Sequence, residues 1–332
     1  MNTMEPPFRM RSDLVRLVEG GFAFPLGVEH GGLRPQQPGW AVEHRPAGET
    51  VCSSLTYTIV VSHELVRPLV RELMRLLPDQ LCGILELGSR DAYREVDVFL
   101  GEPISRDAFL GPWELFETLL LEDATLGVGV NAPEPLVEIF LDHDKRLFIH
   151  VDPVFEQAVE SVLTAWRIPR RRRPELDARV HTPVMTRPVL RDLPRSMVDT
   201  DHLLAELRMD WKLHLDEDPD RNLDGRGREL GETLWRAILL VDQEDPAGRR
   251  QAHAHVWAVA GSRREMQIMV DQAMRSDVEW EFQMLLSMDR VAFDDRPQEL
   301  NALLPQVADA GVLLYRVDPV GTVAGTWDER DG

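Results

Sequence analysis

The sequence predicts an α+β protein of two mixed α/β lobes with largely antiparallel sheets. Apolar runs with the two-residue period of strands alternate along the chain with runs that have the 3.6-residue period of helices. The length of 332 residues exceeds the usual size of one hydrophobic core, so about two domains are expected.

A proline- and arginine-rich segment marks the predicted boundary between the lobes. Residues 167–195 include five prolines, and nine arginines against three acidic residues. Proline removes a backbone donor and biases the preceding residue to extended geometry, which disfavours the interior of a helix or sheet. We therefore predict lobes at 1–166 and 196–332, joined by a linker at 167–195.

Strands and helices are expected to alternate in the first lobe. β-Branched residues favour a strand at 55–61, and the leucine spacing that follows favours a helix. The predicted order is a strand at 55–61, a helix at 63–76, apolar runs at 81–87 and 96–100, a helix capped by Ser105, two strands joined by a turn at 142–145, and a helix at 154–166.

The second lobe begins with LRMDWKLHLD, residues 207–216, in which apolar and polar residues alternate strictly. This period of two predicts a half-buried strand, although Leu204, Leu207 and Trp211 also fit a helix. The order predicted after it is a helix at 229–242, a strand at 252–260, a helix at 262–275, a strand at 279–288, a short helix from Pro297 and a strand at 312–317. The similar segments IHVDP (149–153) and YRVDP (315–319) leave open a degenerate duplication of one unit.

The charge balance favours some partners over others. The chain has 37 basic and 57 acidic residues, a net charge of −20, which opposes the phosphate attraction that dominates nucleic-acid binding. We therefore expect a basic protein partner and no nucleic acid. Only two cysteines occur, and neither a secretory signal nor a run of about 18 apolar residues is present, so we predict a soluble cytoplasmic protein without a membrane partner.

The segment DEDPDRNLDGRGRELG, residues 216–231, contains a candidate calcium site. Asp220, Asn222 and Asp224, followed by Gly225, match the first half of an EF-hand loop, where alternate oxygen ligands surround the ion. Gly231 stands where that loop needs a bidentate glutamate. The glycines do not have dinucleotide-binding spacing, and acidic residues surround them. We favour a solvated, mobile strand-to-helix connection.

Histidines supply a second candidate metal site. His253 and His255 are two residues apart on a predicted strand and should point to the same face, and His214 lies on the polar side of the strand predicted at 207–216. Three imidazoles could hold a transition metal if the strands paired. The acidic and histidine-containing segment at 142–152 is interpreted as a polar hairpin.

Two functions follow from these observations. No local motif of a hydrolase or nucleotide-dependent enzyme is found, and no organic cofactor is implied. We therefore predict a non-catalytic interaction or regulatory module that binds a basic partner. The alternative is a metal-assisted hydrolase using His214, His253 and His255. The sequence does not predict the oligomeric state.

Overall fold

The computed structural model describes residues 6–29, 36–47, 53–172, 185–191, 200–245, 248–302 and 312–319. These residues divide into two compact units, each drawn from separate stretches of the chain. Unit 1 takes its residues from Met1–Gly88, Val96–Arg191 and Leu207–Asp216, and unit 2 from Ser89–Glu95, Asp192–Glu206 and Glu217–Gly332. Helices accompany sheets whose strands pair antiparallel, which confirms the predicted α+β class.

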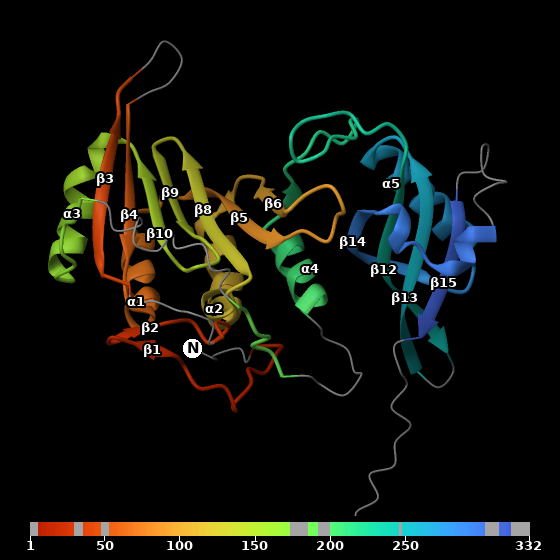
Figure 1. Cartoon of the computed structure of the whole chain (residues 1–332), viewed down its shortest axis with the longest axis horizontal. Helices are drawn as coiled ribbons and strands as arrows, with labels where there is room; N and C mark the ends of the chain where they lie inside the picture. The colour runs from red at the N-terminus through yellow and green to blue at the C-terminus, as the bar shows by residue number, and fades with distance from the viewer. Residues whose placement is uncertain are drawn as a thin grey trace, which may run out of the picture. The chain divides into compact units, whose positions relative to one another are not determined.

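Unit 1 is built on one large antiparallel sheet (Figure 1). Its strands follow the order β11, β6, β5, β8, β9, β10, β4, β3, and β7 pairs with β5. Their bounds are β3 Gly39–Arg45, β4 Ser54–Val60, β5 Gln80–Gly88, β6 Val96–Gly101, β7 Ile104–Ser105, β8 Leu126–Pro133, β9 Leu136–Leu141, β10 Leu147–Val151 and β11 Leu213–Leu215. A separate hairpin joins β1 (Val18–Glu19) to β2 (Phe22–Ala23).

One face of this sheet carries the core of unit 1. Ile59, Leu147 and Leu141 are opposite one another on adjacent strands and are at most 1% exposed. The helices of the unit are α1 His63–Leu73, α2 Arg106–Glu122 and α3 Glu156–Ala165. The predicted cap of α2 is confirmed, because the Ser105 hydroxyl accepts a hydrogen bond from the Ala108 amide at 3.2 Å.

The predicted hairpin between β9 and β10 is confirmed. The two strands pair from Leu141↔Leu147 onward, and the Lys145 amide donates to the Asp142 carbonyl at 2.9 Å. Lys145 has a positive φ of 57° and is buried. Its Nζ donates to the Leu126 carbonyl at 2.6 Å. Burial lowers the pKa of Lys145 to about 8, although Asp123 and Asp142 act in the opposite direction.

The stability of unit 1 should therefore rise as the pH rises from about 8 toward 10.5. In that interval the unfolded chain holds a proton on Lys145 that the folded chain has released, so the free energy of unfolding increases with pH. Lys145→Met should remove most of this rise, as measured by urea unfolding at two pH values. The chain has only one other lysine; it is the exposed Lys212, and Lys212→Met should leave the rise in place. An unchanged slope in Lys145→Met would contradict the argument.

Strand β8 was not predicted from the sequence, and its glycines explain why. Glycine is unfavourable in strand interiors and weakens the sequence signal. A Cβ on Gly129 would lie 2.6 Å from the Ile139 carbonyl oxygen and 2.8 Å from the side chain of Phe140. The close approach of β9 therefore requires glycine at a position where a strand pattern expects a larger residue.

The strand predicted at 207–216 is wrong over most of its length. Helix α4 spans Thr200–Asp210, and the Trp211 amide still donates to the Leu207 carbonyl at 3.0 Å. Only Leu213–Leu215 forms a strand, β11, which pairs with β6. The helical spacing prevails because Trp211 is fully buried and stacks on Phe109, with ring centroids 4.6 Å apart.

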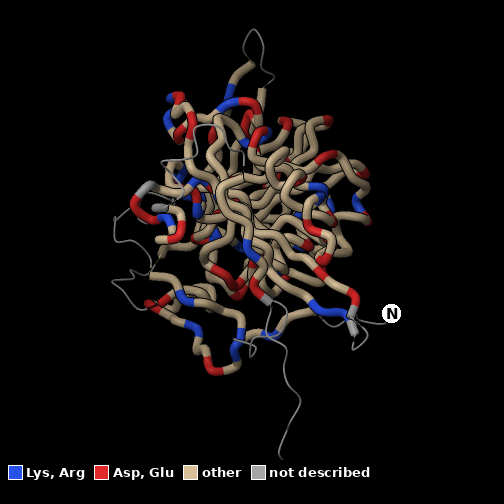
Figure 2. The backbone as a smooth tube through the Cα atoms, turned by 90° about the vertical axis from the view of Figure 1, so that its right-hand side faces the viewer, with Lys and Arg blue, Asp and Glu red and all other residues tan. Residues whose placement is uncertain are grey.

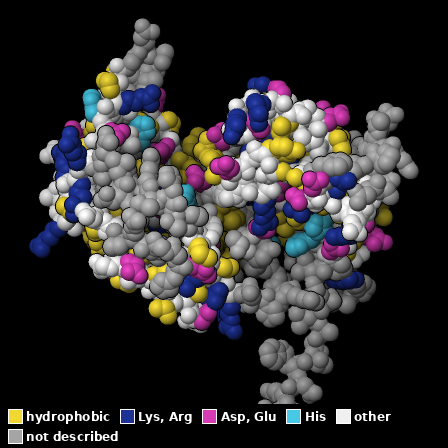
Figure 3. All heavy atoms as spheres, viewed as in Figure 1, with side chains coloured by type: hydrophobic (Ala, Val, Ile, Leu, Met, Phe, Trp, Pro, Cys, Tyr) yellow, Lys and Arg dark blue, Asp and Glu magenta, His cyan; other side chains and the backbone are white. Residues whose placement is uncertain are grey.

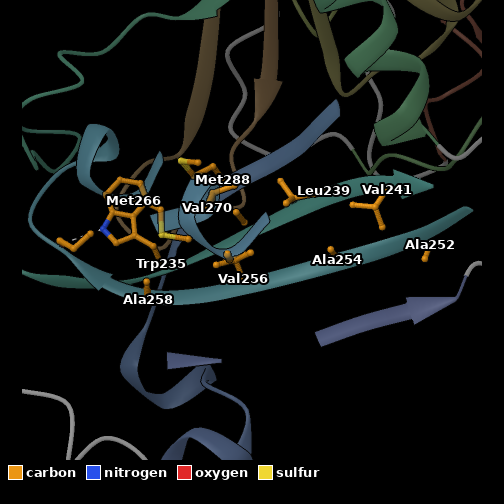
Figure 4. Close-up of a cluster of buried hydrophobic side chains, with 13 residues drawn as sticks. Trp235, Leu239, Val241, Ala252, Ala254, Val256, Ala258, Met266, Val270 and Met288 are labelled. Atoms are coloured by element: carbon orange, nitrogen blue, oxygen red, sulfur yellow. Dashed lines mark hydrogen bonds between the residues drawn. The ribbon is translucent and has the colours of Figure 1, made fainter. Parts of the chain in front are cut away.

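Unit 2 contains a four-stranded sheet of order β14, β12, β13, β15. The bounds are β12 Thr233–Asp245, β13 Gly248–Ala260, β14 Glu281–Val291 and β15 Val312–Pro319. Helix α5 (Arg263–Ser276) packs on one face, where Trp235, Val256 and Met266 belong to a dry core (Figure 4). Four predicted elements of this unit are confirmed with small shifts at their ends: the helix at 262–275 and the strands at 252–260, 279–288 and 312–317.

The helix predicted at 229–242 is wrong, because this segment forms strand β12. Its alternate residues Ala237 and Leu239 face α5, whereas Leu240 packs with Ala205 on the opposite face. A strand with apolar neighbours on both faces has a continuous apolar sequence, which does not distinguish it from a buried helix.

Neither the duplication nor the predicted domain boundary is confirmed. The segment at 149–153 contributes to β10, between β9 and β4, whereas the segment at 315–319 belongs to β15, an end strand of its sheet as described. Parts of the predicted linker bond to unit 1: the Pro169 carbonyl accepts from the Trp40 amide, and the Arg187 guanidinium donates to the Leu26 carbonyl. Residues 173–184 lie outside the described part. No helix within the described ranges is long and apolar enough to cross a membrane.

Candidate functional site

The face of the unit 2 sheet opposite α5 gathers polar side chains from all four strands. We call it the polar face; its members are Arg236 on β12, His253 and His255 on β13, Ser287 and Asp289 on β14, and Arg316 and Asp318 on β15. Side chains directly opposite in a sheet share a face, so the register defines this set. Histidine side chains are visible on the surface of this unit in Figure 3, beside basic and acidic ones.

Apolar clusters border the polar face. At one end Leu240 and Leu286 pack with Ala205. At the other end Trp257 packs with Leu300. Apolar side chains therefore share this face with the polar ones: Trp257 is opposite Arg236, and Leu240 is opposite His253. The Arg236 guanidinium lies over the Trp257 ring at 5.5 Å from its centre.

The surroundings of His255 on this face shift its pKa. Its Nε2 lies 3.6 Å from Asp318 Oδ2, and Asp318 in turn pairs with Arg316 at 2.8 Å. Burial lowers the pKa of His255; Asp318 raises it, while Arg316, Arg236 and His253 lower it further. Among the charged neighbours of His255, Asp318 therefore has the largest effect, and the cationic groups oppose it.

The structure brings together two of the three predicted histidine ligands. His253 and His255 share the polar face, as the two-residue spacing predicts. His214 belongs to unit 1, on β11, where it is 71% exposed and lies 3.5 Å from Glu102. No group of three or more His, Cys, Asp or Glu side chains is placed to hold a metal ion within the described ranges. The transition-metal site stays a prediction.

The three predicted calcium ligands each bond to an arginine. Asp220 pairs with Arg264 through both carboxylate oxygens. The Asn222 side-chain oxygen accepts from Arg290 at 2.8 Å. Asp224 accepts from the Arg228 amide and guanidinium, at 2.9 and 2.7 Å, and these bonds lower its pKa to about 2.

The loop that carries these residues connects β11 to β12, so the expected strand-to-helix connection is wrong. Asn222 is 2% exposed, and its amide also donates to the Gly231 carbonyl at 2.6 Å and to the Thr233 hydroxyl at 2.9 Å. The side chain therefore ties the two ends of the loop together. The calcium site is untested, but its oxygens already have cationic donors.

Calcium at millimolar concentration should leave the melting temperature unchanged relative to magnesium at the same ionic strength. Binding would have to displace guanidinium groups from Asp220 and Asp224, and only a ligand that binds the folded state raises its stability. Differential scanning calorimetry checks this. A rise specific to calcium and lost in Asp220→Ala would establish the site.

A second surface of unit 2 is the turn between α5 and β14, residues 277–282, here called the α5–β14 turn. Val278 is 95% exposed and Phe282 is 51% exposed. The carboxylate of Asp277 accepts from the amides of Glu279 and Trp280, at 2.9 and 3.2 Å, and from the Tyr315 hydroxyl. These hydrogen bonds support the backbone of the turn, which presents the apolar side chains of Val278 and Phe282 to solvent.

Comparisons with protein-family models, with curated proteins and with solved structures gave no significant match to this chain. The fold and its sites therefore define only a class: an α+β protein of two discontinuous units, one of which carries a polar sheet face. Sequence reasoning missed Arg236, Ser287, Arg316 and Asp318, because only the strand register places them beside the histidines.

Proposed function

We propose that this chain is a non-catalytic interaction protein of the cytosol that binds a basic protein partner. The observation that carries the proposal is the α5–β14 turn, where exposed Val278 and Phe282 alternate with exposed Glu279 and Glu281. Solvent-exposed apolar side chains on a fixed backbone supply binding energy at low entropic cost. Carboxylates beside them select a cationic surface.

Intramolecular pairing of arginines supports the choice of a basic partner. Such pairs join Arg16 to Glu122, Arg71 to Glu117, Arg146 to Asp142, Arg228 to Asp224, Arg264 to Asp220 and Arg290 to Asp91. The net charge of −20 means that acidic residues outnumber basic ones in the sequence; Figure 2 marks both kinds along the backbone. Glu279 and Glu281 are acidic residues of this excess, since neither forms an ion pair with another described residue.

The test uses the full chain as bait in extract of its native cells. A partner captured by the wild type should be lost with the variant Glu279→Gln, Glu281→Gln, Phe282→Ser. It should remain bound to the control Glu64→Gln, Glu232→Gln, which loses the same charge at exposed sites. Raising salt from about 0.05 to about 0.5 M should weaken the wild-type complex by about tenfold or more. Capture that neither the turn variant nor salt affects would refute the proposal.

The alternative function is metal-assisted hydrolysis by His214, His253 and His255. One observation favours it: His253 and His255 share a face, and His253 stands directly opposite Asp318, whose carboxylate lies 3.6 Å from His255. Two imidazoles and a carboxylate are a ligand set that transition metals accept, but within the described ranges these side chains are not placed to hold a metal ion together. Metal content after purification without chelator separates the two functions, since stoichiometric zinc or manganese would favour the hydrolase.

A further inference from the structure

A row of side chains crosses the whole unit 2 sheet on its polar face. Ser287 of β14 is opposite Ile238 of β12, Ile238 is opposite His255 of β13, and His255 is opposite Arg316 of β15. Arg236 is one step along β12, beside Trp257. Diagonal neighbours in a sheet lie about 7–8 Å apart, within reach of long side chains.

Two hydrogen-bonding groups of this row are unsatisfied. Arg236 Nε and Ser287 Oγ are shielded from solvent and have no hydrogen-bond partner among the residues that the structure describes. Leaving a buried donor unpaired costs about 1–3 kcal/mol, and more for a charged group. Neighbouring donors that both lack an acceptor favour a ligand that brings oxygen atoms.

Cations and carboxylates both lie near the row: Asp289 stands directly opposite Arg236, and Arg316 pairs with Asp318. Arg236 Nε is nevertheless left without an acceptor among the described residues. Guanidinium groups bind carboxylate and phosphate oxygens through paired hydrogen bonds. A metal cation at the same place would meet Arg236 and Arg316 as like charges.

We propose that the polar face binds a small molecule through an oxyanionic group, a phosphate or a carboxylate. Arg236 and Ser287 donate hydrogen bonds to its oxygens, and Arg316 and His255 border it on the side of β15. Ile238 and Trp257, on the same face, supply apolar contact for the rest of the ligand. The site is separate from the α5–β14 turn and does not depend on the proposed protein partner.

The experiment titrates the full chain with inorganic phosphate and, in a second arm, with acetate, each at an ionic strength matched with chloride. Isothermal titration calorimetry should give saturable binding in at least one arm. Saturation in the phosphate arm alone assigns a phosphate ligand, and saturation in the acetate arm alone assigns a carboxylate. Either outcome supports the site only if the variants Arg236→Lys and Ser287→Ala bind the anion more weakly than the wild type does.

Arg236→Lys keeps the charge but removes Nε, and Ser287→Ala removes the hydroxyl. Each variant should weaken binding of the anion about tenfold, because each loses one hydrogen bond to it: a charge-assisted one in Arg236→Lys and a neutral one in Ser287→Ala. Arg275→Lys, on exposed α5 surface, is the matched control and should bind as the wild type does. Circular dichroism confirms that each variant is folded. Absence of saturable binding in both arms, or equal affinity in Arg236→Lys, Ser287→Ala and Arg275→Lys, overturns the proposal.

Discussion

Replacing Arg290 by methionine should lower the free energy of unfolding of unit 2 by about 3–5 kcal/mol, the usual cost of removing one partner from a buried ion pair. Arg290 is 1% exposed, and its Nε donates to Asp91 Oδ2 at 2.7 Å. The variant would leave the fully buried carboxylate of Asp91 with only the more distant guanidinium of Arg94, 3.8 Å away, as a cation. Urea unfolding followed by tryptophan fluorescence measures the change.

The surroundings of Arg290 add to the expected loss in the free energy of unfolding. Its guanidinium lies over the rings of Tyr93 and Trp235, 5.4 and 5.5 Å from their centres, and donates to Asn222 and to the Leu223 carbonyl. Methionine fills part of the volume but makes none of these hydrogen bonds.

Two further variants test the cause of this loss. Arg275→Met, at an exposed position of α5, should change stability by less than about 0.5 kcal/mol. Asp91→Asn combined with Arg290→Met should recover part of the loss, because no buried charge is then uncompensated. If Arg290→Met cost less than about 1 kcal/mol, this ion pair would not be a main support of unit 2.

Acid should destabilise unit 1 through Glu122. Burial alone would raise the pKa of this carboxyl, but hydrogen bonds from His63 and Arg16 lower it to about 2 from an ordinary 4.5. The Arg16 guanidinium lies 2.6 Å from Glu122 Oε1, and the Leu26 amide donates to Oε2 at 2.9 Å. Because the folded chain has the lower pKa, this carboxylate stabilises the fold at any pH above the pKa of the unfolded chain. The contribution is lost as the pH falls from about 4.5 to about 2. The shift corresponds to about 3 kcal/mol.

The variant Glu122→Gln should be less stable than the wild type at pH 6, and the difference between them should shrink toward zero as the pH approaches 2. Glu114→Gln, an exposed position on the same helix, should follow the wild type at every pH. Urea unfolding at pH 6, 4 and 3 provides the comparison. A gap between Glu122→Gln and the wild type that is the same at all three pH values would contradict the role given to this carboxylate.

Local patterns predicted most of unit 1, because its elements have clear periods and caps. The Ser105 cap and the turn at Asp142–Lys145 rely on bonds between residues a few positions apart, and both are confirmed. The errors in helix α4 and strand β12 have a different origin. Trp211 and Ala237 satisfy two periodicities, and only their tertiary neighbours decide between them.

The candidate sites also combine features that follow from local sequence with features that depend on distant residues. The shared face of His253 and His255 follows from their spacing in the sequence. The arginine bonds to Asn222 and Asp220 come from residues 68 and 44 positions away, so the acidic loop appeared available for calcium. The sequence contains the residues of the polar face but not the register that aligns Ser287 with His255.

The pairing of Asp91 with Arg290 also constrains the order in which the protein can fold during synthesis. The two residues are 199 positions apart, which at ribosomal rates of about 5–20 residues per second separates their emergence by roughly 10–40 s. Unit 1 has all its strands once residue 216 has been made, whereas unit 2 needs β15, near the end of the chain. Residues 89–95 therefore leave the ribosome before the strands of unit 2 have been made. The Asp91 carboxylate, which is buried in the folded protein, stays hydrated until β14, which carries Arg290, has been synthesised.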